Sequence, residues 1–578
     1  MSSNFQPDGK SSQYLFSSFW LSAWAIFLSL SWLLPSHYQP WTGFHGDALI
    51  SLAMLIGGGV VMAGSRDSVR WHWLAALALL SALIPFVQYF SGLVFFLGQA
   101  WVSALYLLGF CLALIVGERW ESIRKDQAMD GLFLAIGIAA IASVGLQFYQ
   151  WFDLEGLDIW VMPSVYGRPY ANFAQPNKLG TFLLLGLIAS GWGYFRQKIG
   201  LPVALFMSLF LVFGVALTQS RTAFFGMLLL VFLAFFWQKH IVSRHVLFGL
   251  VGLFIFLLVS YKGIPLISEM LLIDTQSDRF TDVSETLKAD MRPLAYRLFL
   301  GAALAKPWFG YGWFHVASAQ FVVADQFPAL GTVFLHSHNL FLDLVLWVGW
   351  PVGGILSISL CVWLVLSFRA VRDVKAALLM MAVGVVGWHA MLELPLHYAT
   401  FLLPTGLVMG VLNGKSRSPN VIFQSSRWQI FVLFGIAITM LVVVIVDYFK
   451  VENNLTALRF ERSIIGKQLT PLAPPDVLAL TQLRGFLVMG RFLPKPGMTP
   501  YEIESLRQSA IAVPNPANIF RFVQILVLNQ RIDEANLWVN IVYKTVSPDV
   551  FKQMALAWQS ETKSNPVLAA VSWGSSEQ

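Results

Sequence analysis

Cysteine and charged residues are scarce in this 578-residue chain. The two cysteines, Cys111 and Cys361, both lie inside apolar runs, so the sequence indicates no disulfide framework. Only 12% of the residues are charged and 57% are hydrophobic, whereas roughly a quarter of the residues in soluble domains are charged. This composition excludes an ordinary soluble enzyme and predicts a polytopic membrane protein.

Nucleotide-binding motifs are also missing. The sequence has no P-loop and no glycine-rich turn between a strand and a helix. The net charge of +7 comes from lysines and arginines in short loops between apolar runs, which is typical of membrane topology. We therefore expect no nucleic-acid partner and contact with membrane lipid.

About thirteen apolar runs approach the roughly 20 residues that cross a bilayer. They begin near Leu15, Ala48, Trp73, Val94, Gly131, Leu179, Pro202, Ala223, Val246, Leu340, Ala376, Tyr398 and Trp428. The run from Leu340 to Phe368 contains Pro351, which predicts one kinked helix or two separate elements. The predicted fold is an all-α polytopic membrane protein.

The distribution of basic residues predicts the orientation of these spans. Lysine and arginine concentrate in alternate loops, which predicts a cytoplasmic N-terminus and a C-terminus on the outer side, the periplasm if the cell is Gram-negative. We expect a transmembrane domain over residues 1–449, including a periplasmic loop at 262–338, and a periplasmic helical domain over 450–578. Two short helices around NQRIDEA fit either a tetratricopeptide-type hairpin or a small helical cap.

Five polar clusters fall on the predicted periplasmic face. They are YGRPYANFAQPNKLG with Arg168, Gln175, Asn177 and Lys178; TQSRTAFFG with Arg221; the loop with Arg292 and Arg297; HSHN with His336, His338 and Asn339; and WHAMLELPLHYATF with His389, Glu393, His397 and Tyr398. Ionisable groups near membrane depth are functional candidates because they are costly to keep there.

Each cluster also has a purely structural interpretation. Arg221 at a span end could extend its charged head to the lipid headgroups, and Arg168 and Lys178 could be ordinary loop charges. His389, Glu393 and His397 have helical i, i+4, i+8 spacing and could form a polar seam between helices, although Pro395 disturbs that helix.

Together the clusters fit a phosphoryl-activated donor. Arginines bind phosphate oxygens through two parallel hydrogen bonds, and a histidine can accept a hydroxyl proton near neutral pH. No nucleotide is supplied outside the cell, so a lipid pyrophosphate is the natural donor. A metal held by His338, His389 and Glu393 is the rival interpretation, but HExxH and cysteine ligands are missing and we predict no metal or other cofactor.

The motifs SVYGRPYANFAQPNKLGTFLL, TQSRTAFFG, HSHNLFLDLVLWVGWPVGG and HAMLELPLHYATFLLPTGL resemble those of bacterial O-oligosaccharyltransferases that glycosylate type IV pilins. These enzymes belong to the superfamily of O-antigen ligases and polymerases. The resemblance covers roughly residues 10–450. The HxHN element is shared across the superfamily, whereas the GRPYxNFAQPN loop with HxxxExPLxY is more specific to protein-glycosylating members.

The resemblance implies metal-independent, inverting transfer of a whole oligosaccharide from undecaprenyl pyrophosphate to a serine or threonine of a pilin-like protein. By motif position, His338 would be the catalytic base, Gln175 and Tyr398 essential site residues, and Arg221 and Arg297 pyrophosphate ligands. His336 would orient its neighbour or the phosphate. Lys178 stands where the family usually has histidine, and its ammonium can contact phosphate but is a poor neutral proton acceptor.

Two other functions compete with this one. An O-antigen ligase or polymerase would use the same donor with a glycan or lipid A acceptor, but the C-terminal tail provides extra surface that suits a folded protein acceptor. A lipid or polysaccharide transporter would carry ionisable residues deep in several spans and often an inverted repeat. The spans here are mostly uncharged and show no such repeat.

Overall fold

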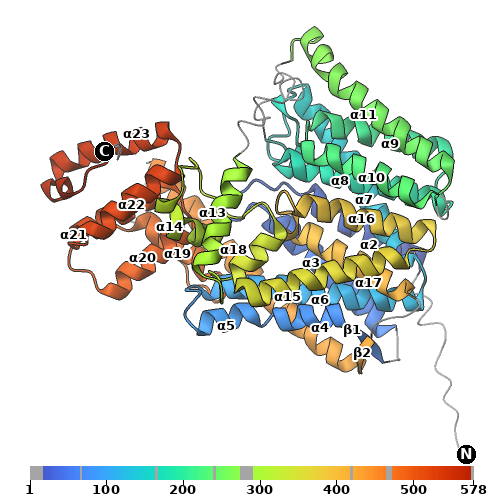
Figure 1. Ribbon diagram of the computed structural model, residues 1–578, viewed down its shortest axis with the longest axis horizontal. Helices are drawn as coiled ribbons and strands as arrows, with labels where there is room; N and C mark the ends of the chain where they lie inside the picture. Colours follow the sequence, from blue (N-terminus) through green and yellow to red (C-terminus); the bar gives the residue numbers. More distant parts are fainter. Residues whose placement is uncertain are drawn as a thin grey trace, which may run out of the picture. The chain divides into compact units, whose positions relative to one another are not determined.

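The computed structural model describes residues 17–64, 68–162, 167–238, 242–273, 291–416, 421–463 and 472–574. These residues form mostly α-helices (Figure 1). They divide into two compact units: Met1–Leu80, Tyr106–Thr286 and Cys361–Leu441 make the first, and Ser81–Leu105, Leu287–Leu360 and Val442–Gln578 the second.

The first unit is a bundle of apolar helices. Its elements are α2 (Ser18–Leu33), α3 (Phe44–Ala63), β1 (Val69–His72), α4 (Trp73–Ser81), most of α6 (Leu97–Ile123), α7 (Gln127–Trp151), η2 (Ala171–Phe173), α8 (Pro176–Phe195), α9 (Leu201–Leu217), α10 (Arg221–Trp237), α11 (Arg244–Met270), α16 (Val374–Ala390), η4 (Pro395–His397), α17 (Ala399–Lys415) and β2 (Val421–Ser425). Helices α15 (Leu340–Ala370) and α18 (Arg427–Ser463) each contribute residues to both units.

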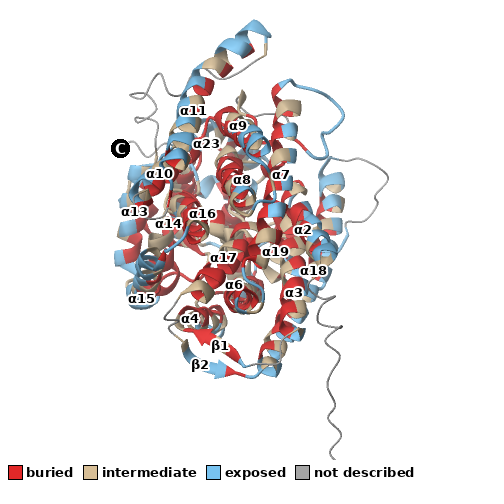
Figure 2. Ribbon diagram, turned by 90° about the vertical axis from the view of Figure 1, so that its right-hand side faces the viewer, coloured by how far each residue is buried: buried red, intermediate tan, exposed pale blue. Residues whose placement is uncertain are grey.

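Helix α8 lies in the core of this bundle. Of its most apolar stretch, 78% is buried, against 22% for α11, and the difference is visible in Figure 2. A helix that is apolar all round is either buried in protein or faces lipid. Helix α8 is therefore fixed by protein on all sides, while α11 leaves most of its apolar surface for a bilayer.

A helix lies at each of the thirteen expected starts, within a few residues. Within the described residues, eight helices are long and apolar enough to cross a membrane, namely Phe44–Ala63, Trp73–Phe90, Leu97–Ile123, Gln127–Trp151, Pro176–Phe195, Arg244–Met270, Leu340–Ala370 and Arg427–Ser463. The other five expected spans are helices of 16 or 17 residues. A polytopic, mostly helical membrane protein is confirmed, and the number of crossings stays a prediction.

Helix α15 is broken at Gly349 rather than at Pro351. Gly349 has φ +80°, and a Cβ there would lie 2.3 Å from the Trp308 carbonyl oxygen. The Trp347 carbonyl, which cannot receive an N–H from Pro351, instead accepts from Gly312 N (3.1 Å) and Gln88 Nε2 (2.8 Å). The glycine permits the turn, and the missing proline donor explains why neighbouring segments bind this carbonyl.

A two-stranded antiparallel sheet was not expected from an all-α prediction. Strand β1 pairs with β2, and Trp71 stacks on Phe423 with ring centroids 4.9 Å apart. The strands are only four and five residues long. Such short segments carry too little periodicity to be found from sequence.

The second unit contains the C-terminal helices. It comprises α5 (Ile84–Phe90), α13 (Arg292–Ala305), α14 (Val316–Val323), η3 (Ala324–Gln326), α19 (Thr481–Arg491), α20 (Pro500–Ala512), α21 (Pro516–Leu528), α22 (Ile532–Thr545), α23 (Pro548–Ser564) and η5 (Pro566–Ala570). The expected helical pair around NQRIDEA is confirmed as α21 and α22. Residues 274–290 of the predicted loop at 262–338 lie outside the described residues.

The C-terminal helices share a core with the segment that precedes HSHN. Phe321 of α14 packs edge-on against Trp538 of α22, with centroids 5.8 Å apart. The Lys544 carbonyl accepts hydrogen bonds from Leu330 N (2.9 Å) and Gly331 N (3.1 Å). Removing the tail would therefore expose the apolar side of residues 316–331 as well as remove any docking surface.

A cluster of charges joins four helices of the first unit around Asp126. The Asp126 carboxylate accepts from Lys415 Nζ (2.6 Å) and Lys375 Nζ, and it pairs with Arg196 (3.3 Å). Burial raises the pKa of Asp126, but the hydrogen bonds from Lys375 and Lys415 outweigh it, so the pKa lies below its ordinary value. The carboxylate therefore stabilises the fold above its ordinary pKa of 3.8, and this contribution is lost as the pH falls through the folded-state pKa.

Asp126→Asn is expected to lower the free energy of unfolding at pH 7. Asp126 has φ +64°, which asparagine tolerates, so the change isolates the charge. Three cations would lose their shared partner, at a cost of roughly 2–3 kcal/mol, less than for a fully buried pair because the cations are partly exposed. The change in the free energy of unfolding is measured by thermal unfolding in detergent, with tryptophan fluorescence as the signal. Asp158→Asn, at an exposed carboxylate, is the control and should unfold at the wild-type temperature.

Candidate active site

The HSHN turn, residues 336–339, is held by hydrogen bonds to the start of α15. Ser337 is fully buried, and its N–H donates to Asp343 Oδ1 at 2.7 Å. Asn339 Oδ1 accepts from Phe341 N and Leu342 N, both at 3.1 Å, and so caps the helix. Asn339 thus has a structural task in addition to any contact with substrate, and the turn is rigid where it carries the two histidines.

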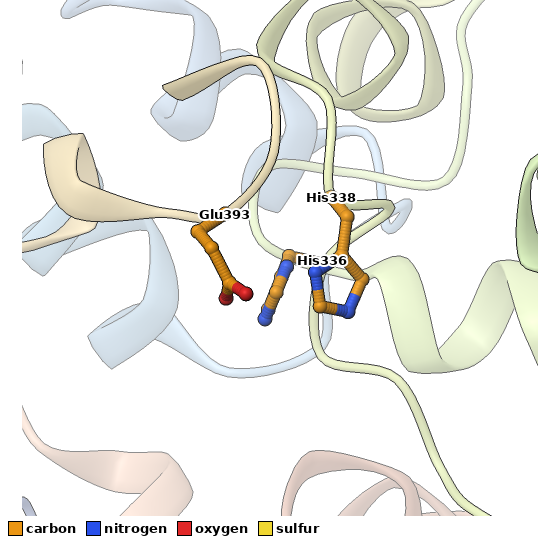
Figure 3. A group of neighbouring side chains, drawn as sticks. All are labelled: His336, His338 and Glu393. Carbon is orange, nitrogen blue, oxygen red and sulfur yellow. The ribbon is translucent and has the colours of Figure 1, made fainter. Parts of the chain in front are cut away.

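His338 occupies the left-handed region of the backbone, with φ +61°. Its carbonyl accepts a hydrogen bond from the Tyr296 hydroxyl at 3.1 Å. Its ring lies 4.1 Å from that of His336, centroid to centroid, with the planes tilted by 58° (Figure 3). Both rings are half-buried, so both can meet a substrate. The unusual backbone conformation points to a side chain whose direction matters.

Helix α13, whose Tyr296 hydroxyl contacts this turn, also carries Arg292 and Arg297. Arg297 follows Tyr296 directly and is exposed, while Arg292 begins the helix and is half-buried. An exposed guanidinium next to a helix-anchoring tyrosine is available for a phosphate.

In the first unit, Glu393 joins two residues of the first motif. Its Oε1 accepts from Asn177 Nδ2 at 3.1 Å, and its Oε2 accepts from Gln175 Nε2 at 3.3 Å. Glu393 is buried, with 7% of its surface exposed. One carboxylate therefore orients both amides, a pairing that the sequence motifs did not predict.

The segment 389–397 is not one helix, so the i, i+4, i+8 seam is not formed. Helix α16 ends at Ala390, and Pro395 begins the short helix η4. His389 is fully buried in the last turn of α16, while His397 lies in η4. Burial lowers the pKa of His397 to about 3, so its ring is neutral at physiological pH.

Arg168 donates hydrogen bonds to the tight turn that precedes Arg221. Its Nε and Nη2 donate to the Thr218 carbonyl at 3.2 and 3.1 Å. In the same turn, Ser220 Oγ caps α10 by accepting from Ala223 N (3.1 Å) and donates to Asn177 Oδ1 (2.7 Å). Arg221, half-buried, is the first residue of that helix. The Arg221 turn and the Gln175 loop thus form one network.

Lys178 is buried rather than lying free in a loop. Only 7% of its surface is exposed, and its Nζ lies 3.9 Å from the centroid of the Tyr398 ring. Tyr398 is half-buried at the start of α17. The lysine and the tyrosine, 220 positions apart, are therefore direct neighbours.

Several residues of these networks escaped the sequence analysis. Ser220, Tyr296 and Asp343 each hold a predicted site residue or its turn. Ser220 and Asp343 lie at helix starts, where such residues are common caps. Their position alone gave no reason to select them.

Three family models match successive parts of the chain. Residues 169–192 match "Protein glycosylation ligase", residues 205–357 match "O-Antigen ligase", and residues 377–559 match "Virulence factor membrane-bound polymerase, C-terminal". The matched segments include the Gln175 loop, the HSHN turn and Glu393. The fold and these matches define the class: a multi-pass membrane protein with segments similar to O-antigen ligases and protein glycosylation ligases.

Two curated relatives from Acinetobacter baylyi indicate which kind of enzyme within this class the chain resembles. The chain is 29% identical to a "General O-oligosaccharyltransferase" over 524 residues, covering 88% of this chain and 89% of the relative. It is 26% identical to a "ComP-specific O-oligosaccharyltransferase" over 420 residues, covering 71% and 74%. The chain is similar to bacterial O-oligosaccharyltransferases over most of its length, and the expected enzyme class, a glycosyltransferase, is confirmed.

Proposed function

We propose that this enzyme transfers an oligosaccharide as one unit from undecaprenyl pyrophosphate to a serine or threonine of a pilin-like protein. The supporting observation is the rigid HSHN turn, which presents His338 next to His336 in a chain similar to O-oligosaccharyltransferases over most of its length. One relative is named for a single protein acceptor, which favours a protein over a glycan as acceptor.

The reaction needs a base and a site for the leaving group. His338 takes the proton from the acceptor hydroxyl as its oxygen attacks the anomeric carbon. The bond between that carbon and the pyrophosphate oxygen breaks, and the lipid pyrophosphate leaves with the electron pair. Arg221 and Arg297 stabilise its charge, while Gln175 and Tyr398 position the donor. Arg168, Asn177, Glu393, His389 and His397 support these groups.

The active site is proposed to face the periplasm of a bacterial inner membrane, with the N-terminus in the cytoplasm. The bias of lysine and arginine toward alternate loops supports this orientation. The donor glycan would then be assembled in the cytoplasm and presented on the outer leaflet.

Intact mass spectrometry tests the proposed function. A pilin is co-expressed with the enzyme in a host that makes one defined lipid-linked glycan. A mass increase of one glycan unit, dependent on the enzyme, is the expected result. An unmodified pilin together with elongated or lipid A-linked glycan would instead establish a polymerase or ligase.

We propose that the reaction proceeds without a metal ion. The base and the arginines supply the proton transfer and charge stabilisation that a metal would otherwise provide. EDTA treatment of the purified enzyme should leave the transfer rate within about twofold of the untreated rate, since an essential metal contributes far more. Loss of activity with EDTA that zinc or magnesium restores would favour the metal alternative.

We propose that the C-terminal helices bind the acceptor. Tyr501 of α20, Leu537 of α22 and Leu556 of α23 are exposed there, and aromatic residues are common anchors of protein interfaces. A photo-crosslinking residue at each position should capture the pilin, whereas one at the exposed Ile422 of β2 should not. Glycosylation that proceeds without crosslinks from any of the three positions would contradict this docking surface.

A further inference from the structure

The Tyr398 ring lies close to groups from two other parts of the first unit. Lys178 Nζ of α8 lies over the ring. Directly before α3, the Gly43 backbone approaches so closely that a Cβ there would lie 2.9 Å from Tyr398 Cδ1 and 3.1 Å from Asp47 Oδ2. Any side chain at position 43 would displace the ring or the carboxylate.

Asp47 links the starts of two helices beside this ring. Its Oδ2 accepts from the Tyr106 hydroxyl of α6 at 2.8 Å, and its Oδ1 accepts from Thr400 N at 3.3 Å. Asp47 lies in the first turn of α3, and Thr400 lies in the first turn of α17, two residues after Tyr398. A carboxylate at helix N-termini is favourably placed because the helix dipoles present positive ends there.

Lys178 and Asp47 are both buried, with 7% and 5% of their surfaces exposed. An isolated buried charge is very unfavourable, so a buried ammonium needs a compensating anion. Burial of the Asp47 carboxyl disfavours its ionised form, and the Lys178 charge partly offsets this. Tyr398 thus lies beside a buried lysine and a buried carboxyl that interact electrostatically.

A purely structural role for this pair is the alternative. The position of Lys178 argues against it, because the lysine lies in the same first turn of α8 as Asn177, directly after Gln175. That turn therefore contacts Glu393 through its amides and Tyr398 through its lysine. A shift of the pair would move two proposed site residues together.

We propose that Lys178, Asp47 and Tyr106 are positioning residues that fix the Tyr398 side chain for the transfer reaction. This inference rests on the proposed function through the role of Tyr398. Lys178 contacts the face of the ring, and Asp47, oriented by Tyr106, holds the start of α17 through Thr400 N. None of the three needs to touch the reacting atoms.

Double-mutant kinetics on the full-length enzyme test the coupling. Lys178→Met and Asp47→Asn should each lower kcat about tenfold, with KM for the acceptor changed less than about twofold, because a misplaced ring affects the reaction more than acceptor binding. The double variant should be no slower than either single variant, since each displaces the same Tyr398 ring. Lys178→Arg, which keeps a cation that stacks on aromatic rings, should stay within about threefold of wild type.

A second comparison shows whether the lysine acts through the tyrosine. In a Tyr398→Ala background, Lys178→Met should have no further effect on kcat. Lys198→Met, at an exposed lysine just beyond the other end of α8, is the matched control and should equal wild type.

Multiplicative effects, with the double variant about a hundredfold slower than wild type, would overturn the proposal. Full activity of Lys178→Met would do the same. If Lys178→Met or Asp47→Asn lowers the thermal stability of the enzyme, the kcat values of two milder variants are compared instead. Lys178→Arg preserves the charge, and Tyr106→Phe preserves the packing of the ring. If the wild-type enzyme itself modified no protein acceptor, the proposed function would fail, and that result is distinct from every outcome above.

Discussion

His338→Asn is expected to slow glycan transfer by about 10²–10⁴-fold, the usual contribution of a general base. The amide cannot take the proton of the acceptor hydroxyl, so the attacking oxygen would keep it. Asparagine is the informative substitution because residue 338 has φ +61°, which asparagine adopts readily and alanine does not. The hydrogen bond from Tyr296 to the backbone carbonyl of residue 338 would persist.

The rate is measured as glycosylated pilin per minute at saturating donor, by intact mass, with enzyme amounts matched. His245→Asn, at an exposed histidine in the first turn of α11, is the control and should keep the wild-type rate. His336→Asn should have a smaller effect than His338→Asn if His336 only orients its neighbour. A His338→Asn enzyme that retains the wild-type rate would show that another group is the base.

The helices were largely predictable because each depends on one continuous apolar run. The break in α15 was predicted at the wrong residue. Pro351 removes a donor but fits the first turn of a helix, whereas Gly349 adopts the left-handed conformation that ends the first part. The packing of α14 against Trp538 could not be predicted from the sequence either, because it joins segments more than 200 residues apart.

The candidate site residues were recognised one motif at a time, and their partners were not. Gln175 and Glu393 are 218 positions apart, and no local pattern connects them. Asp47 and Tyr106 look like ordinary polar residues in apolar runs. Only the packed structure shows that Asp47 meets both Tyr106 and the start of α17.

Glu393→Gln is expected to lower kcat about 10²-fold, the loss that a displacement near 1 Å in a site can cause. The carboxylate accepts from Gln175 and Asn177 with its two oxygens. A glutamine at 393 keeps one acceptor oxygen and turns an NH₂ group toward one of these two donors. Because Asn177 Oδ1 is already bound to Ser220, its amide cannot turn over without breaking that bond.

Gln175 is therefore the group expected to move when Glu393 is neutralised. Gln175→Ala and Glu393→Gln should then lower kcat by similar factors, and their combination should be little worse than either, because both remove one oriented amide. Initial rates over a range of donor concentrations separate kcat from KM. Glu561→Gln, at an exposed glutamate of α23, should match wild type. Wild-type kinetics for Glu393→Gln would mean that the hydrogen bonds to Gln175 and Asn177 hold the fold alone, and Gln175 would have to be oriented by the substrate.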